Sequence, residues 1–284
     1  MKNYFLFDTL IQREKTAPMI TAARKLIELL GIDAPSFKGA KADLGSEFMG
    51  LDKLKFLEHY AYNLTLAADQ KRDILCFEQS SFISHAQTKD MLINDANLKF
   101  EIAGRLEKHN LSLNLDVQVV SLEQLLLEEL EEMDTEKLTS LVKHPFGNFQ
   151  AALFFGSNAC RARKYRKEEL VTRLLDSVQL KCVKHESSHE SDGFEVYDAS
   201  SSLAKKLAAK AMLDMFDNAA DFVLVCDARS FIMFDFYQKE LEKISGREIG
   251  LSVLSLAELL LLAFGETSKK AIGLDQHKVA ISLI

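Results

Sequence analysis

Residues 221–265 read DFVLVCDARSFIMFDFYQKELEKISGREIGLSVLSLAELLLLAFG, and the order of features in this stretch recurs in residues 73–130. The earlier copy begins DILCFEQSSFISH and ends VVSLEQLLLEEL. In both copies an aspartate is followed by an apolar run. A carboxylate then occurs three residues before the serine of a Ser-Phe-Ile phrase, and a Val-x-Ser-Leu phrase further on is followed by several leucines. The repetition predicts an internally duplicated protein.

Each copy predicts a parallel α/β unit. The apolar runs at residues 73–77 and 221–226 are too short for helices and lack polar alternation, which indicates strands buried on both faces. After a helical stretch, further short strands are expected at residues 116–120 and 250–254. Both lead directly into a Ser-Leu-x-Gln or Ser-Leu-x-Glu capping box that begins a helix. This succession is typical of parallel α/β folds.

The duplication extends over both halves of the chain. Residues 3–7 and 151–155 predict a first strand in each half, and the turn-rich segment HPFGN at residues 144–148 lies near the middle. We therefore expect an α/β protein with two similar halves, residues 1–142 and 148–284, related by pseudo-twofold symmetry, each with a small, mostly parallel sheet flanked by helices. Other helices are expected at residues 18–30, 51–69, 165–178 and 202–217, a strand at residues 180–184 and a polar loop at residues 185–193.

Composition indicates an ordinary globular protein. The chain is 48% apolar and 27% charged, and its net charge of −7 argues against a general attraction to nucleic acid. The N-terminus lacks the apolar core of a signal peptide, and the most apolar stretch, residues 251–264, is too short to span a bilayer, so we expect a cytoplasmic protein without direct membrane insertion. Four widely spaced cysteines indicate neither a disulfide framework nor a zinc knuckle.

Polar side chains follow the two predicted central strands. Glu78 and Ser81 come directly after the first, and Asp227 and Ser230 directly after the second. Open parallel α/β sheets bind ligands at the carboxyl ends of their strands, so these residues are candidates for functional sites.

Several further phrases occur in an order that resembles a known family. They are NLTLA at residues 63–67, KHPFG at residues 143–147 ahead of ALFFGS at residues 152–157, FYQ at residues 236–238 and VLSLAELL at residues 253–260. The chain resembles the B subunit of heterodisulfide reductase and its relatives, whose duplicated cysteine-rich (CCG) domains also occur in some succinate dehydrogenase, glycolate oxidase and lactate-utilisation subunits.

In that family, a lone cysteine, a Cys-Cys-Gly loop and a Cys-x-x-Cys turn in each half hold iron–sulfur clusters. The matching positions here are Asp8, Asp43, Leu44, Glu78 and Ser81 in the first half and Ser157, Ser187, Ser188, Asp227 and Ser230 in the second. None is a cysteine, and such clusters depend on thiolate ligands. Cys76 and Cys226 lie next to ligand positions and are interpreted as small buried residues. The resemblance thus implies the fold, while the substitutions argue against an iron–sulfur cofactor.

The resulting hypothesis is a degenerate, cluster-less relative that acts as an accessory or interaction component of a redox assembly. The resemblance suggests iron–sulfur or flavin subunits as protein partners. No cofactor is expected. The alternative is an enzyme or ligand-binding protein that reuses the vacated pockets, with or without a divalent metal.

The metal alternative rests on two residue sets. His185 and His189 match the zinc-protease pattern H-E-x-x-H, but their segment lacks the apolar period of a buried helix and is predicted to be a loop. In that loop either histidine could join Asp227 around a divalent metal. In the first half, Asp8, Asp43 and Glu78 form an oxygen set suited to a hard cation.

One dense basic run interrupts this acidic chain. It comprises Arg161, Arg163, Lys164, Arg166 and Lys167. A solvated helix start is the usual explanation for such a run, and the alternative is a docking site for a phosphate, a carboxylate or an acidic partner.

Overall fold

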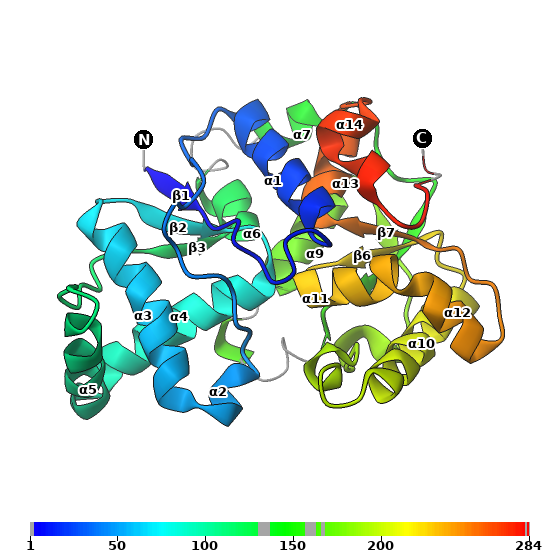
Figure 1. Ribbon diagram of the computed structural model, residues 1–284. Coiled ribbons are helices and arrows are strands. Elements are labelled where there is room, and N and C mark those ends of the chain that lie inside the picture. Colours follow the sequence, from blue (N-terminus) through cyan, green and yellow to red (C-terminus); the bar gives the residue numbers. More distant parts are fainter. Residues whose placement is uncertain (1–2, 130–136, 157–162, 166–167, 282, 284) are drawn as a thin grey trace. The chain divides into compact units, whose positions relative to one another are not determined.

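Two structural units make up the protein (Figure 1). The computed structural model describes residues 3–129, 137–156, 163–165, 168–281 and 283. The first unit contains residues 1–11, 27–122 and 162–166, and the second contains residues 12–26, 123–161 and 167–284. Residues 12–26 therefore belong with the second unit, although they precede the predicted boundary.

The first unit contains a parallel sheet with strand order β1-β2-β3. Its strands are β1 (Tyr4–Leu6), β2 (Asp73–Cys76) and β3 (Val119–Ser121). Beyond β1, Leu6 forms an isolated parallel bridge with Ser36. The central strand β2 is buried from Ile74 to Cys76, as its uniformly apolar sequence predicts.

The second unit repeats this arrangement with order β5-β4-β6-β7, and all its strand pairs are parallel. The strands are β4 (Gln150–Phe154), β5 (Lys181–Cys182), β6 (Phe222–Val225) and β7 (Ser252–Ser255). The added edge strand β5 corresponds to the bridge at Ser36 in the first unit. The prediction of an α/β protein with two similar, small parallel sheets is confirmed.

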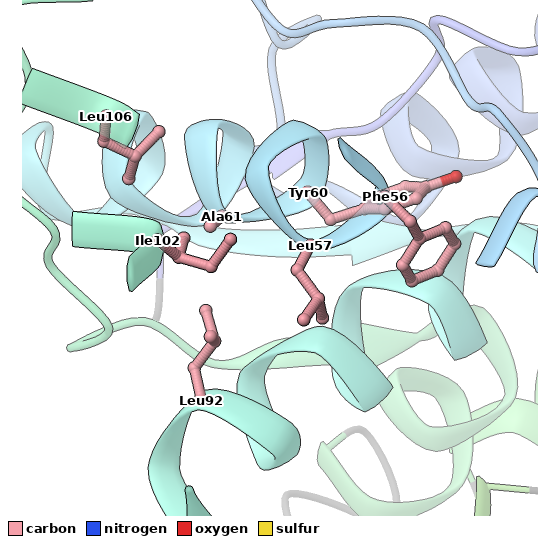
Figure 2. Packing of buried hydrophobic residues seen from close by; sticks show 7 residues of the cluster. All are labelled: Phe56, Leu57, Tyr60, Ala61, Leu92, Ile102 and Leu106. Carbon is pink, nitrogen blue, oxygen red and sulfur yellow. The ribbon is translucent and has the colours of Figure 1, made fainter. Parts of the chain in front are cut away.

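Helices flank the first sheet. They are α2 (Phe48–Leu51), α3 (Lys53–Asp69), α4 (Gln79–Asn94) and α5 (Ala96–Glu107), and α1 (Ala17–Leu30) ends in this unit. The helix predicted at residues 51–69 is observed as α3 and begins two residues later, because Asp52 is its N-cap: this residue is extended and its side chain accepts a hydrogen bond from the backbone N–H of Lys55. Helices α3, α4 and α5 contribute Phe56, Leu57, Leu92 and Ile102 to one apolar cluster (Figure 2).

The second unit has a longer series of helical segments. They are α6 (Leu122–Gln124), η1 (Leu125–Glu129), α7 (Lys137–Leu141), η2 (Arg163–Tyr165, counted with the first unit), α9 (Glu168–Ser177), η3 (Glu186–His189), η4 (Phe194–Val196), α10 (Ser201–Asp217), α11 (Ala228–Phe231), η5 (Ile232–Phe236), α12 (Gln238–Ser245), α13 (Leu256–Ala263), α14 (Lys269–Ile272) and η6 (Leu274–Gln276). Both η1 and η5 are π-helical turns. Throughout the described parts of both units, no helix has the length and apolarity needed to cross a bilayer.

Candidate functional site

Asp8 and Glu78 follow neighbouring parallel strands, as predicted, and both are buried. Asp8 accepts a hydrogen bond from the hydroxyl of Ser36, with 2.6 Å between the oxygens. Glu78 caps helix α4 by accepting from the backbone N–H groups of Ser80 and Ser81 at 3.0 and 2.6 Å. Each carboxylate therefore organises its own loop or helix end.

Asp43, in the loop that matches the family's Cys-Cys-Gly segment, is held by helix α3. The hydroxyl of Tyr60 donates to the Asp43 carboxylate at 2.7 Å and accepts from the backbone N–H groups of Leu44 and Gly45 at 2.9 and 3.1 Å. Tyr60 is fully buried. One phenol thus fixes three consecutive residues of the loop.

His85 extends this polar region between helices α3 and α4. Its Nδ1 lies 2.7 Å from the carbonyl oxygen of Ser81, and its Nε2 lies 3.2 Å from the side-chain amide of Asn63. Burial lowers the pKa of His85 to about 4, so the ring is neutral, donating to Ser81 and accepting from Asn63. Tyr60 and His85 therefore contact Asp43 and Ser81, two of the matched first-half positions, and Asn63 contacts His85.

In the second unit, Ser230 and Asp227 meet a residue that the sequence reading did not select. The Ser230 hydroxyl donates to the carboxyl group of Asp192 at 2.6 Å, and Asp227 caps α11 by accepting from the backbone N–H of Arg229 at 2.7 Å. Burial, together with the charge of Asp227, raises the pKa of Asp192 to about 7. Asp192 gave no sequence signal beyond its place in the turn-like Ser-Asp-Gly.

The glycine after Asp192 fixes how the loop is positioned. Gly193 has a φ of +82°, and a Cβ atom there would lie 2.2 Å from the carbonyl oxygen of Ala204 on helix α10. Only glycine tolerates both this backbone conformation and the close approach.

Ser187 and Ser188 attach the preceding turn to the sheet and to α10. The backbone N–H of Ser187 donates to Asp214 at 2.8 Å, and the Ser188 hydroxyl donates to the carbonyl oxygen of Leu153 at 2.8 Å. Ser157 lies outside the described residues.

The two histidines of the H-E-x-x-H pattern point to different partners. Residues 186–189 form a 3₁₀ turn, so the predicted non-α-helical segment is observed. His185 Nε2 lies 3.0 Å from the Leu153 carbonyl oxygen, whereas His189 Nε2 lies 2.9 Å from Glu168. Among the described residues, no three His, Cys, Asp or Glu side chains are arranged to hold a metal ion. Neither proposed set, His185, His189 and Asp227 or Asp8, Asp43 and Glu78, therefore comes together as ligands in this structure.

The three cysteines that the structure describes do not fit an iron–sulfur cluster, and Cys160 lies outside the described residues. Cys76 and Cys226 are buried and Cys182 is exposed, and none of the three forms a disulfide bond. Burial, reinforced by Glu123 and Asp227, raises the pKa of Cys226 well above its usual range and keeps it a protonated thiol. The described ligand positions hold oxygen side chains or Leu44, and their buried carboxylates and hydroxyls are hydrogen-bonded within the protein. A cluster requires several converging thiolates, so these residues do not match that cofactor.

The basic run is described only in part. Arg161, Arg166 and Lys167 lie outside the described residues, as does the side chain of Arg163. Lys164 and Tyr165 both bond to the carboxylate of Asp90 on α4, at 2.5 and 2.6 Å. Partial burial raises the pKa of Asp90, but these two hydrogen bonds outweigh it and lower the pKa overall. An anion-binding or partner-binding role for the run stays a prediction.

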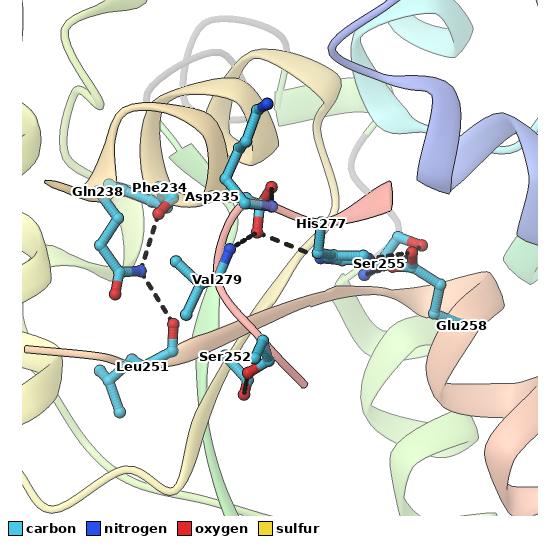
Figure 3. A network of polar contacts seen from close by, with 11 residues as sticks. Phe234, Asp235, Gln238, Leu251, Ser252, Ser255, Glu258, His277 and Val279 are labelled. Carbon is cyan, nitrogen blue, oxygen red and sulfur yellow. Dashed lines mark hydrogen bonds and ion pairs between the residues drawn. The ribbon is translucent and has the colours of Figure 1, made fainter. Parts of the chain in front are cut away.

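A second buried network lies near the C-terminal segment (Figure 3). His277, whose side chain is fully buried, bonds to Asp235 at 3.2 Å and to Glu258 at 2.8 Å. Burial lowers the pKa of His277, but the charges of Glu258 and Asp235 outweigh burial and raise the pKa to about 10. Glu258 also accepts from the backbone N–H and hydroxyl of Ser255 in the predicted capping box. The histidine is a buried cation between two carboxylates.

Comparisons with known proteins agree with these features. Residues 194–278 match the HdrB-like C-terminal domain. The chain is 27% identical over 258 residues to the 8-methylmenaquinol:fumarate reductase membrane anchor subunit of Wolinella succinogenes, with 88% of each chain covered. The crystal structure of a hypothetical protein from Helicobacter pylori matches the whole chain with a TM-score of 0.82 at 20% identity, which shows a shared fold; this chain spans about half, 53%, of that protein. The resemblance predicted from the sequence is confirmed.

Proposed function

Since the chain carries an HdrB-like C-terminal domain and is a distant homologue of a fumarate reductase subunit, we propose that it is an accessory subunit of a redox assembly. In this role it contributes a protein-binding scaffold and no iron–sulfur cluster of its own. Its partners are the iron–sulfur or flavin subunits that carry the electrons.

One observation carries the proposal. Each described position that would supply a thiolate takes part in hydrogen bonds that stabilise a loop, a turn or a helix end. These positions hold Asp8, Asp43, Leu44, Glu78, Ser81, Ser187, Ser188, Asp227 and Ser230. These groups now stabilise the scaffold. A scaffold kept after its cofactor ligands are replaced is what an accessory subunit requires.

The Wolinella succinogenes relative supports the assembly role. That protein is named as a subunit of a fumarate reductase. The match covers 88% of each chain, so the similarity extends over nearly the whole of both sequences. We infer that the present chain binds redox subunits through its surface.

The cofactor part of the proposal is tested by strictly anaerobic purification of the untagged chain, followed by incubation with Fe²⁺ and sulfide under reducing conditions. We expect iron and sulfide contents far below one per chain before and after incubation. Stoichiometric iron with inorganic sulfide and a brown colour would refute it.

The assembly part needs a separate measurement. The chain is tagged at its native locus and purified from the source organism under anaerobic conditions, and the co-purified fraction is analysed for flavin, iron and subunit identity. We expect redox subunits in fixed ratio to the chain. Recovery of the chain alone, at native expression and low salt, would contradict the accessory role.

A further inference from the structure

The second unit contains a row of aromatic rings interleaved with lysines from three distant parts of the sequence. We call it the basic aromatic row; it consists of Lys15, Tyr197, Lys205, Phe236, Tyr237 and Lys278. Tyr237 stacks on Tyr197 with 5.2 Å between ring centroids and packs edge-on against Phe236 at 5.2 Å. None of the candidate sites above uses these residues.

The lysines lie over the ring faces along the row. Lys15 Nζ is 4.6 Å from the centroids of both Phe236 and Tyr237 and donates to the Tyr237 hydroxyl at 2.6 Å. Lys278 lies 5.1 Å from Phe236, and Lys205 lies 5.3 Å from Tyr237. Ring faces attract cations, so the aromatic groups hold three ammonium groups in one region.

The positive charge of the row is only partly neutralised. Lys205 pairs with Glu240 at 2.5 Å. Lys15 and Lys278 have no carboxylate within ion-pair distance among the residues that the structure describes. In a chain with a net charge of −7, this local excess of positive charge attracts acidic groups.

The backbone beneath the row is also unusual. Phe236 ends the π-helical turn η5, and the buried Asp235 beside it binds His277 and the backbone N–H of Lys278. Turns of this type occur frequently at functional sites. The same network therefore fixes both Phe236 and the segment that carries Lys278.

We propose that the basic aromatic row is the docking surface for an extended acidic segment of a partner protein. This inference rests on the accessory role proposed above and specifies the chemistry of the contact. The lysines are distributed along rings whose neighbours are 5.2 Å apart instead of converging on one point. A single phosphate needs converging donors, whereas carboxylates on alternate residues of an extended segment recur about every 7 Å. The partly exposed rings of Tyr197 and Phe236 supply the rigid contact area typical of protein interfaces.

The test uses fluorescein-labelled decaglutamate, with decaglutamine and a thymidine decanucleotide as comparison probes, titrated with the full-length chain. We expect saturable binding of decaglutamate that weakens as salt is raised, no binding of decaglutamine, and weaker binding of the oligonucleotide. The Lys15→Glu/Lys278→Glu variant should bind decaglutamate about tenfold or more weakly. The control variant Lys206→Glu/Lys243→Glu makes the same charge change at exposed lysines of α10 and α12 and should bind within about twofold of the wild type.

A second variant, Phe236→Leu, keeps the charges and the apolar contact but removes the ring that holds Lys15 and Lys278; it should also weaken binding. Circular dichroism melts confirm that each variant is folded. The proposal is overturned by the absence of saturable decaglutamate binding, by an equal loss in the control variant, or by tighter binding of the oligonucleotide. If one of these outcomes occurs but redox subunits still co-purify, the docking proposal fails and the accessory role stands. If decaglutamate binds as expected but no redox subunits co-purify, the accessory role fails and the docking proposal stands.

Discussion

Ser230 donates its hydroxyl hydrogen to Asp192 over 2.6 Å, joining two residues that are 38 positions apart in the sequence. Ser230 occupies a position where the family resemblance places a cysteine. The bond fastens the loop before Gly193 to helix α11, so the serine at this position stabilises the fold. It also brings Asp192 near Asp227, which affects the stability of the protein in a pH-dependent way.

Replacing Asp192 with Asn should remove a pH-dependent loss of stability. The pKa of Asp192 is raised from its ordinary value of 3.8 to about 7. Between these values the folded state holds a proton that the unfolded state has released, so stability falls as pH rises, by at most about 1.4 kcal/mol per unit. We expect Asp192→Asn to melt higher than the wild type at pH 8 and close to it at pH 4. Asn can still accept from Phe194 and contact Ser230.

Thermal melts at pH 4, 6 and 8 check this expectation, with Asp198→Asn, an exposed aspartate, as the control. A melting temperature that is higher for the wild type than for Asp192→Asn, by a margin that grows toward pH 8, would contradict the expectation.

His85 should produce the opposite pH dependence. Its pKa is lowered from 6.5 to about 4, so between these values the unfolded state binds more protons, and stability is lost as pH falls. In the wild type this slope offsets that of Asp192 over the shared window. We expect the His85→Gln variant to lose less free energy of unfolding than the wild type as the pH falls from 7 to 4. The Asp192→Asn variant should lose more than the wild type over the same range. Urea unfolding between pH 4 and pH 7 measures both slopes, and identical slopes in the two variants would refute the assignment.

Tyr60 should be important for the stability of the first unit. Its hydroxyl bonds to Asp43 and to the backbone N–H groups of Leu44 and Gly45. Tyr60→Phe keeps the ring in the apolar cluster but removes one donor to Asp43 and the acceptor for the Leu44 and Gly45 amides, which should cost about 1–3 kcal/mol. Hydrogen exchange should speed up at the amides of Leu44 and Gly45 in particular. The control Tyr62→Phe changes a half-buried tyrosine that bonds to neither loop amide and should leave their exchange unchanged. Unchanged exchange in Tyr60→Phe would contradict the role of its hydroxyl.

The sequence predicted the strands and most helices because their signals are local. Residues 73–77 and 221–226 are uniformly apolar, and Ser255 with Glu258 forms the predicted capping box. The start of α3 differs by two residues from the prediction, because the side chain of Asp52 caps the helix and makes Lys53 its first residue. The resemblance also located the polar positions at the strand ends.

The partners of those positions could not be predicted in the same way. Asp192, His85 and His277 are single residues whose contacts depend on tertiary packing; His277 meets Asp235 from 42 residues away. Periodicity reports which face of an element is buried, not which polar groups meet there. Hence the sequence did not predict the contacts of His277, which lies in a C-terminal segment without clear hydrophobic periodicity.

His277 should be the most costly of these residues to replace. His277→Gln leaves Glu258 and Asp235 buried without their cation, and breaking such a buried pair costs about 3–5 kcal/mol. The pKa of His277 is raised from 6.5 to about 10, so its stabilisation is fully present below pH 6.5 and is lost as pH rises toward 10. The difference between wild type and variant should therefore shrink from pH 6 to pH 10. His109→Gln is the matched control, because His109 pairs with Glu58 at 3.1 Å on the surface and should contribute less than about 1 kcal/mol. Urea unfolding of the three proteins at both pH values measures the effect, and a difference for His277→Gln that is small at pH 6, or that grows toward pH 10, would show that the histidine is not a buried cation.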